Sequence, residues 1–180
     1  MKKSKALLSF LISLLPANRL RILGYRLLLH YDISFDCRVG YANVLLFESC
    51  SMRGASIGVM NYLSAVHCDM APGSAIGYLN KCVYVYRLSL GEGAVLGSQI
   101  RVTGGRPGRS PYPEVQNFFV GAKSIITRKH AFDVLDTITI GEDVTFGGSA
   151  SEVWTHGFDL HHICNMAAVT IGNRVYIGSR

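Results

Sequence analysis

Large apolar side chains recur every six residues along most of this chain, and glycine often follows them. The repeat is clearest toward the C-terminal end, at Ile140-Gly141, Phe146-Gly147, Ile171-Gly172 and Ile177-Gly178. One apolar residue in every six indicates short parallel strands wound into a prism, in which each face turns one large side chain inward and glycine eases the corner. The pattern therefore predicts an all-β solenoid over residues 39–180.

The same repeat is less regular in the first half of the solenoid. Its expected inward positions there are Val39, Leu45, Ser51, Ile57 and Leu63. Val39 and Ile57 are 18 residues apart, which is one full coil of a three-sided prism. The repeat slips between residues 69 and 74, where Pro72-Gly73 marks a turn, and it resumes at Ile76.

Residues 1–38 precede the repeat and are expected to form a helical lead-in or cap. An apolar run from Ala6 to Leu15 follows a basic start, and a second helix is expected over residues 19–30. Asn18 is a candidate N-cap for that helix, and the leucines at positions 20, 23 and 27 share one of its faces. A signal peptide is the alternative for the first segment, but no clean small-residue cleavage site follows it.

The net charge of +6 is a property of the N-terminal segment. Residues 1–30 contain six basic residues and no acidic one, whereas the remainder has twelve of each sign. This distribution favours contact with an anionic membrane surface over a nucleic-acid groove. No apolar run approaches the ~18 residues that a membrane span needs.

Five cysteines without a CxxC pair favour free thiols in a reducing compartment over a disulfide framework. Cys50 and Cys68 are 18 residues apart, so they are expected to stack in successive coils.

Two interruptions of the repeat are expected to carry function, because loops on a rigid scaffold hold binding and catalytic groups. The first is a loop at about residues 104–119, where Arg106 and Arg109 either contact a neighbouring subunit or an acidic ligand or are simply solvated. Val102 and Val120 are 18 residues apart, so this loop is expected to replace the sides of one coil. The second interruption follows His156, which makes that residue the leading catalytic candidate.

Three stretches of the sequence resemble a known family. They are RKHAFD (128–133), ITIGEDVTFGGSASEVWTHGFD (138–159) and VTIGNRVYIGS (169–179). Together they resemble the hexapeptide-repeat acyltransferases, and they are most similar to the sugar O-acetyltransferases of bacterial capsule, exopolysaccharide and lipopolysaccharide gene clusters. The resemblance implies a left-handed parallel β-helix, a homotrimer with active sites between subunits, acetyl-CoA as the donor and a sugar hydroxyl as the acceptor.

We also expect a cytoplasmic protein that contacts the inner membrane peripherally through its basic residues 1–30. In that family, coils beyond the position of Ile177 supply much of the CoA groove and the C-terminal cap, and we expect this chain to lack them. The residues expected to begin the CoA groove are Arg174, Gly178, Ser179 and Arg180.

The resemblance gives the catalytic imidazole to His156. Imidazole suits the role because its ordinary pKa lies near neutrality, so it can take the proton of a hydroxyl that attacks a thioester. A carboxylate should orient the other ring nitrogen. Three carboxylates are candidates for that role, namely Asp159, Glu152 and Asp133.

The acceptor is expected to contact His130, Asp133 and Trp154. His130 holds the fifth place of the hexad that begins at Ile126, as His156 does in the hexad that begins at Glu152. It either meets His156 across a subunit interface or is a hydrogen-bonded structural histidine. The indole of Trp154 either stacks on the sugar ring or packs against the protein.

Three other functions remain open at the level of sequence. One is N-acylation of a nucleotide-linked amino sugar, which would keep the fold and the donor. Another is a zinc site formed by His130, His156 and His161, as in the gamma-class carbonic anhydrases, although no metal is expected. The third is a non-catalytic scaffold that docks through its basic helices.

Overall fold

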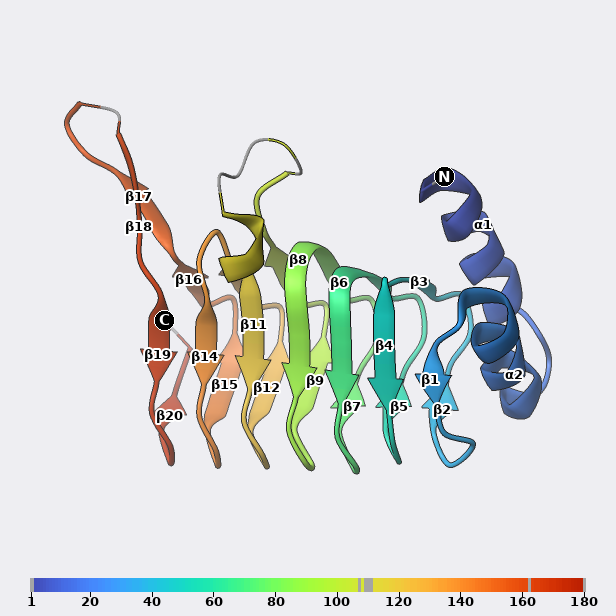
Figure 1. Ribbon diagram of the computed structural model, residues 1–180. Coiled ribbons are helices and arrows are strands. Elements are labelled where there is room, and N and C mark those ends of the chain that lie inside the picture. Colours follow the sequence, from blue (N-terminus) through green and yellow to red (C-terminus); the bar gives the residue numbers. More distant parts are fainter. Residues whose placement is uncertain (1, 107, 109–111, 162, 180) are drawn as a thin grey trace.

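The chain folds into a parallel β-solenoid that is capped at its N-terminal end by two helices (Figure 1). The structure is a computed structural model and describes residues 2–106, 108, 112–161 and 163–179. Helices α1 (Lys2–Ser13) and α2 (Asn18–Leu29) come first, and the strands follow one another around the prism. The predicted solenoid with a helical lead-in is therefore confirmed.

Three strand-built faces, which we call A, B and C, surround the core. Face A contains β3 (Val44–Leu46), the first half of β6 (Tyr62–Met70), the first half of β8 (Lys81–Leu90), β10 (Arg101–Thr103), β13 (Ala131–Asp133) and β16 (Glu152–Trp154). Face B contains β1 (Asp32–Ile33), β4 (Ser49–Met52), the second halves of β6 and β8, β11 (Asn117–Val120), β14 (Ile138–Ile140) and β19 (Val169–Ile171). Face C contains β2 (Arg38–Val39), β5 (Ser56–Ile57), β7 (Ala75–Ile76), β9 (Val95–Ser98), β12 (Ile125–Arg128), β15 (Thr145–Ser149) and β20 (Tyr176–Ile177).

The strands of each face pair in parallel with those of the coils before and after them. Because β6 and β8 continue around the corner between faces A and B, these two faces form one hydrogen-bonded sheet, while face C is a second sheet. Val39 pairs with Ile57, and Cys50 pairs with Cys68, so the expected 18-residue coil is confirmed at this end.

One expected inward position of the repeat was wrong. Met52 is buried in the prism, whereas Ser51 lies outward and pairs with Asp32. The corner between Leu45 and Met52 is one residue longer than a strict hexad allows, which moves the inward position along the chain by one.

The core consists of the inward side chains of the three faces. On face C these are Val39, Ile57, Ile76, Leu96, Ile126 and Phe146, all buried. Successive coils approach each other closely at the corner that follows face C. A Cβ on Gly97, which comes directly after Leu96, would lie 1.5 Å from the carbonyl oxygen of Thr127. Any larger residue at position 97 would force the coils apart, which explains why glycine follows the apolar residue there.

Buried asparagines form a ladder at the corner between faces C and A. The side-chain oxygen of Asn43 accepts the backbone N–H of Asn61, and that of Asn61 accepts the backbone N–H of Asn80. Each side-chain amide also donates to a glycine carbonyl of the neighbouring coil, as that of Asn61 does to Gly77. The ladder therefore satisfies backbone groups that turn away from the strand pairing at this corner.

Both predicted helices are present, and α1 includes the basic start that precedes the apolar run at Ala6 and ends before Leu15. The role expected for Asn18 was wrong, because Ala17 is the N-cap residue and makes no side-chain cap. Asn18 instead donates to the carbonyl oxygen of Cys37 and accepts the N–H of Val39, which ties α2 to the first coil.

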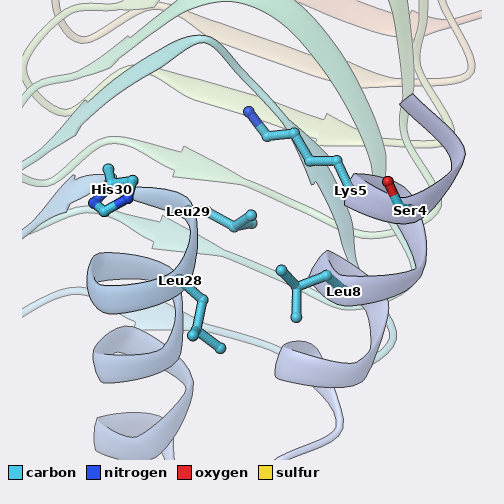
Figure 2. Close-up of a pocket in the computed structure, with 6 residues that line it drawn as sticks. All are labelled: Ser4, Lys5, Leu8, Leu28, Leu29 and His30. Carbon is cyan, nitrogen blue, oxygen red and sulfur yellow. The ribbon is translucent and has the colours of Figure 1, made fainter. Parts of the chain in front are cut away.

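The buried face of α2 is formed by Arg21, Ile22, Tyr25 and Leu29, whereas the predicted leucine stripe faces outward. Arg21 is held under the cap by bonds from its guanidinium to the carbonyl oxygens of Val39 and Leu15. A hollow of about 360 Å³ between the helices is lined in part by Leu8, Leu28 and Leu29 (Figure 2). Neither helix, nor any other in the described part of the chain, is long and apolar enough to cross a membrane.

Two insertions leave the solenoid at the corner between faces A and B (Figure 1). The first joins β10 to β11 and contains the short 3-10 helix η1 (Pro113–Val115); Arg109 lies outside the described residues. The second is an antiparallel hairpin of β17 (His156–Phe158) and β18 (Cys164–Met166). Val102 and Val120 lie on different faces, so the first loop extends a corner and does not replace the sides of a coil.

Candidate active site

The imidazole of His156 meets the carboxylate of Asp133 at the base of the β17–β18 hairpin. The distance from Nδ1 of His156 to Oδ1 of Asp133 is 2.9 Å. Both side chains are mostly sheltered, with 16% of the His156 side chain and 22% of the Asp133 side chain exposed. The pair is therefore close enough for a charge-assisted hydrogen bond and still open to a ligand.

Strand register brings these two residues together although they are 23 positions apart. Asp133 ends β13 and pairs with Trp154 of β16, so the chain reaches Thr155 and His156 just as it turns the corner beside Asp133. Thr155 fixes that turn, because its buried hydroxyl donates to the carbonyl oxygen of Asp133 and accepts the backbone N–H of Asp136. These bonds tie together the two backbone segments that carry His156 and Asp133.

The hydrogen bond selects one tautomer of His156. An ionised carboxylate can only accept, so Nδ1 must carry the proton. A neutral ring then has a free lone pair on Nε2, and this atom has no partner among the described residues. An imidazole in this state can accept a proton from a hydroxyl group.

The other two carboxylates proposed for this role have different partners. Oε2 of Glu152 accepts a hydrogen bond from the indole N–H of Trp154 at 3.1 Å. Oδ1 of Asp159 accepts the backbone N–H groups of His161 and Ile163 and shapes the tip of the hairpin. The geometry therefore favours Asp133 as the group that orients His156.

A hollow of about 310 Å³ lies beside this pair on face A. Its lining residues are Arg101, Thr103, Ala131, Phe132, Asp133 and Trp154. Trp154 is 54% exposed, and the centroid of its ring lies 5.6 Å from that of His156. The indole therefore presents an open aromatic face next to the imidazole, in a position where a sugar ring could stack.

Two roles were open for His130, namely contact with His156 across a subunit interface and a structural role inside the chain. Its position in this structure fits the structural role. It is 1% exposed and lies in T-shaped contact with Phe146 inside the prism. Nδ1 accepts the backbone N–H of Ser151, which leaves Nε2 to donate to the hydroxyl of Thr127. Burial lowers the pKa of His130, in agreement with a neutral ring.

The residues expected to begin a CoA groove lie away from His156 within this chain. Arg174 is in the turn between β19 and β20, where its backbone N–H donates to the carbonyl oxygen of Glu142. Gly178 follows β20, and the hydroxyl of Ser179 accepts the N–H of Ser149 on face C. Arg180 lies outside the described residues.

The three histidines of the zinc hypothesis do not converge. His130 is in the core with both ring nitrogens bonded, His156 is at the base of the hairpin, and His161 is at its tip. Within the described residues, no group of three or more His, Cys, Asp or Glu side chains is arranged to hold a metal ion.

Comparison of the chain with models of protein families, with curated proteins and with solved structures found no match. The similarity to sugar acetyltransferases therefore rests on the motifs quoted above, and the interpretation of the site rests on its own geometry.

Sequence reasoning did not find Arg101 and Thr103 as site residues. Nothing near them in the sequence marks them, and they reach the hollow only because β10 pairs with β13. The signal that could have found them is positional: Thr103 is in register with Asp133, and Arg101 with Ala131.

Proposed function

We propose that this protein is an acetyl-CoA-dependent acyltransferase that acetylates a sugar hydroxyl in the synthesis of a bacterial surface polysaccharide. The observation that carries the proposal is the hydrogen bond between His156 and Asp133. It places the proton on Nδ1 and leaves Nε2 without a partner among the described residues, beside a hollow of about 310 Å³ that has an aromatic wall in Trp154. The motifs around this site are those that resemble the sugar O-acetyltransferases.

In the proposed reaction, Nε2 of His156 takes the proton of the acceptor hydroxyl as its oxygen attacks the thioester carbonyl. Asp133 stabilises the imidazolium that forms, because its carboxylate faces Nδ1–H. Collapse of the tetrahedral intermediate breaks the C–S bond, and the imidazolium returns the proton to the departing thiolate. The products are the O-acetyl sugar and free CoA.

The proposal includes a homotrimer with sites between subunits. Arg174, Gly178 and Ser179 lie on other parts of the prism than His156, which suits a donor site completed by a neighbouring copy. The donor places the protein in the cytoplasm, and the basic cap is compatible with a position at the inner membrane. The mass of the particle in solution, measured by light scattering, tests the trimer.

The test of function is acetyl transfer by the wild type, His156→Ala and the control His161→Ala. Acetyl-CoA binding is first measured by calorimetry, and acceptors with hydroxyl and amine groups are then screened by mass spectrometry. We expect acetylation of a hydroxyl acceptor, a loss of turnover of about 10²–10⁴-fold in His156→Ala and none in His161→Ala. Near-normal turnover of His156→Ala would remove His156 as the base, and acetylation of amines alone would favour the N-acyltransferase alternative.

A further inference from the structure

We propose that the acceptor carries a negative charge, a carboxylate or a phosphate, which Arg101 and Lys81 bind while its hydroxyl lies at His156. This inference rests on the function proposed above and specifies the class of substrate. Arg101 lines the hollow that also contains Asp133 and Trp154. Lys81 is the in-register neighbour of Arg101 on the adjacent strand and extends the site toward the N-terminal end.

The two cations lie side by side with no acidic partner. Neighbouring strands are only about 4.8 Å apart, and both side chains point outward because Cys82 and Val102 turn inward. Neither takes part in an ion pair or a side-chain hydrogen bond with the described residues. Like charges in directly opposed positions repel, so the arrangement is unfavourable until an anion lies between them.

The other charges on this face do not neutralise the pair. The column that contains Arg101 continues through Ala131 to Glu152, whose carboxylate is bonded to Trp154. Asp133 is bonded to His156. The hollow thus has Arg101 at one end and, at the other, Asp133 and Trp154, which both contact His156. An acidic sugar whose anionic group lies at Arg101 would therefore direct a hydroxyl toward His156.

The indole of Trp154 provides a direct measurement of binding. It is the single tryptophan of the chain and lines the hollow, so its fluorescence should report an entering ligand. The probes are methyl glucoside, its 6-phosphate and methyl glucuronide. The proteins are the wild type, Arg101→Gln, Lys81→Gln, and Lys123→Gln as a control on an exposed turn elsewhere.

We expect at least one charged glycoside to bind about tenfold more tightly than methyl glucoside. Which of the two binds more tightly distinguishes a carboxylate from a phosphate. Arg101→Gln and Lys81→Gln should remove the preference without lowering the melting temperature, because each relieves the repulsion, and Lys123→Gln should retain it. Equal binding of charged and neutral glycosides, no binding of the charged ones, or a preference that survives in Arg101→Gln would overturn the inference.

This measurement separates the inference from the proposed function. His156→Gln should still bind the charged glycoside although it transfers no acetyl group. If binding depends on Arg101 but no acceptor is acetylated, the anion site is supported and the proposed enzymatic function is contradicted. If Arg101→Gln leaves acetyl transfer unchanged, the enzymatic function is supported and the anion site is contradicted.

A separate observation, at the opposite end of the solenoid, concerns the cap. The outward faces of both helices expose leucines, namely Leu7, Leu11 and Leu14 of α1 and its end and Leu20, Leu23 and Leu27 of α2. The opposite faces cover the first coil. Residues 2–30 contain no acid, and Lys3 and Arg19 are exposed beside the leucines.

We infer that this leucine face docks on an anionic bilayer surface. A helix pair that is apolar on its outward side and basic at its edges inserts between headgroups and attracts acidic lipids. The hollow between the helices combines an apolar wall of Leu8, Leu28 and Leu29 with the polar side chains of Ser4, Lys5 and His30 (Figure 2). Because the cap and the hairpin lie at opposite ends of the solenoid, docking would hold His156 away from the bilayer (Figure 1).

Vesicle sedimentation tests the docking. Vesicles of phosphatidylcholine with phosphatidylglycerol are compared with vesicles of phosphatidylcholine alone. The proteins are the wild type, the double variant Leu11→Gln/Leu23→Gln, and Arg19→Gln. The control is Leu160→Gln at the hairpin tip, where the leucine is 96% exposed. We expect binding to anionic vesicles that falls about tenfold or more in the double variant, less in Arg19→Gln and not in Leu160→Gln. Equal binding to both kinds of vesicle, or a leucine face that only joins two copies in light scattering, would refute it.

Discussion

The backbone N–H of Ser151 donates a hydrogen bond to Nδ1 of His130, at 3.2 Å. A protonated Nδ1 would set two donors against each other, and burial also disfavours the charged ring, which lowers the pKa of His130. Between the lowered pKa and the ordinary value of 6.5, the unfolded chain binds the proton more readily than the folded one. His130 therefore contributes stability that is present above about pH 6.5 and is lost as the pH falls below it.

The first prediction concerns this pH dependence. The free energy of unfolding of the wild type should fall between pH 7.5 and about pH 5, and His130→Gln should be less stable at pH 7.5 and show a shallower fall. Urea unfolding at a series of pH values measures both effects. His161→Gln, altered at an exposed histidine, is the control and should keep the wild-type slope; a slope unchanged in His130→Gln would contradict the prediction.

The second prediction concerns the tautomer of His156. Long-range ¹H–¹⁵N correlation spectra should show the proton on Nδ1 in His156 and on Nε2 in His130, which serves as an internal reference. Asp133→Ala should give His156 a mixture of tautomers and lower turnover by about 10²–10⁴-fold, because the imidazolium loses its carboxylate. Glu152→Ala should change neither the tautomer nor the melting temperature. An Nδ1 proton that persists in Asp133→Ala would show that Asp133 does not orient the ring.

A third prediction follows from the asparagine ladder. Asn61→Ala removes the acceptor of the Asn80 N–H, which is buried, and the donor to the Gly77 carbonyl, which is partly buried. Unpaired buried groups of this kind each cost about 1–3 kcal/mol, so the variant should be less stable by about 2–4 kcal/mol in denaturant unfolding. Asn165→Ala, at an exposed position of β18, should cost less than about 0.5 kcal/mol. A similar loss in the two variants would mean that the ladder is not stabilising.

The fourth prediction concerns thiol reactivity. Cys164 is exposed, whereas Cys37, Cys50, Cys68 and Cys82 are buried and none is in a disulfide. A hydrogen bond with Cys68, together with burial, raises the pKa of Cys50, and burial raises that of Cys82. At pH 8, Ellman's reagent should therefore react rapidly with one thiol per native chain and with all five in denaturant. Cys164→Ser should abolish the rapid phase, and a rapid phase that remains would show that the coils open.

The sequence by itself determined the architecture, because the inward side chains of a solenoid repeat locally. The inward positions of Ile140, Phe146 and Ile177 follow from their six-residue spacing. That spacing can be recognised without knowing which residues they contact in the neighbouring coils. The same locality revealed His156, which stands where the repeat breaks. The helices of the cap were equally visible, as apolar runs bounded by Pro16 and Asn18.

The tertiary structure alone decided which residues meet. Contacts between coils depend on the length of every corner and insertion between them, and these lengths vary, as the extra residue before Met52 and the loop after β10 show. Register therefore chose Asp133 over Asp159 as the partner of His156, and it placed Arg101 beside Lys81. It also enclosed His130 in the prism, where its two nitrogens have partners that no spacing in the sequence reveals.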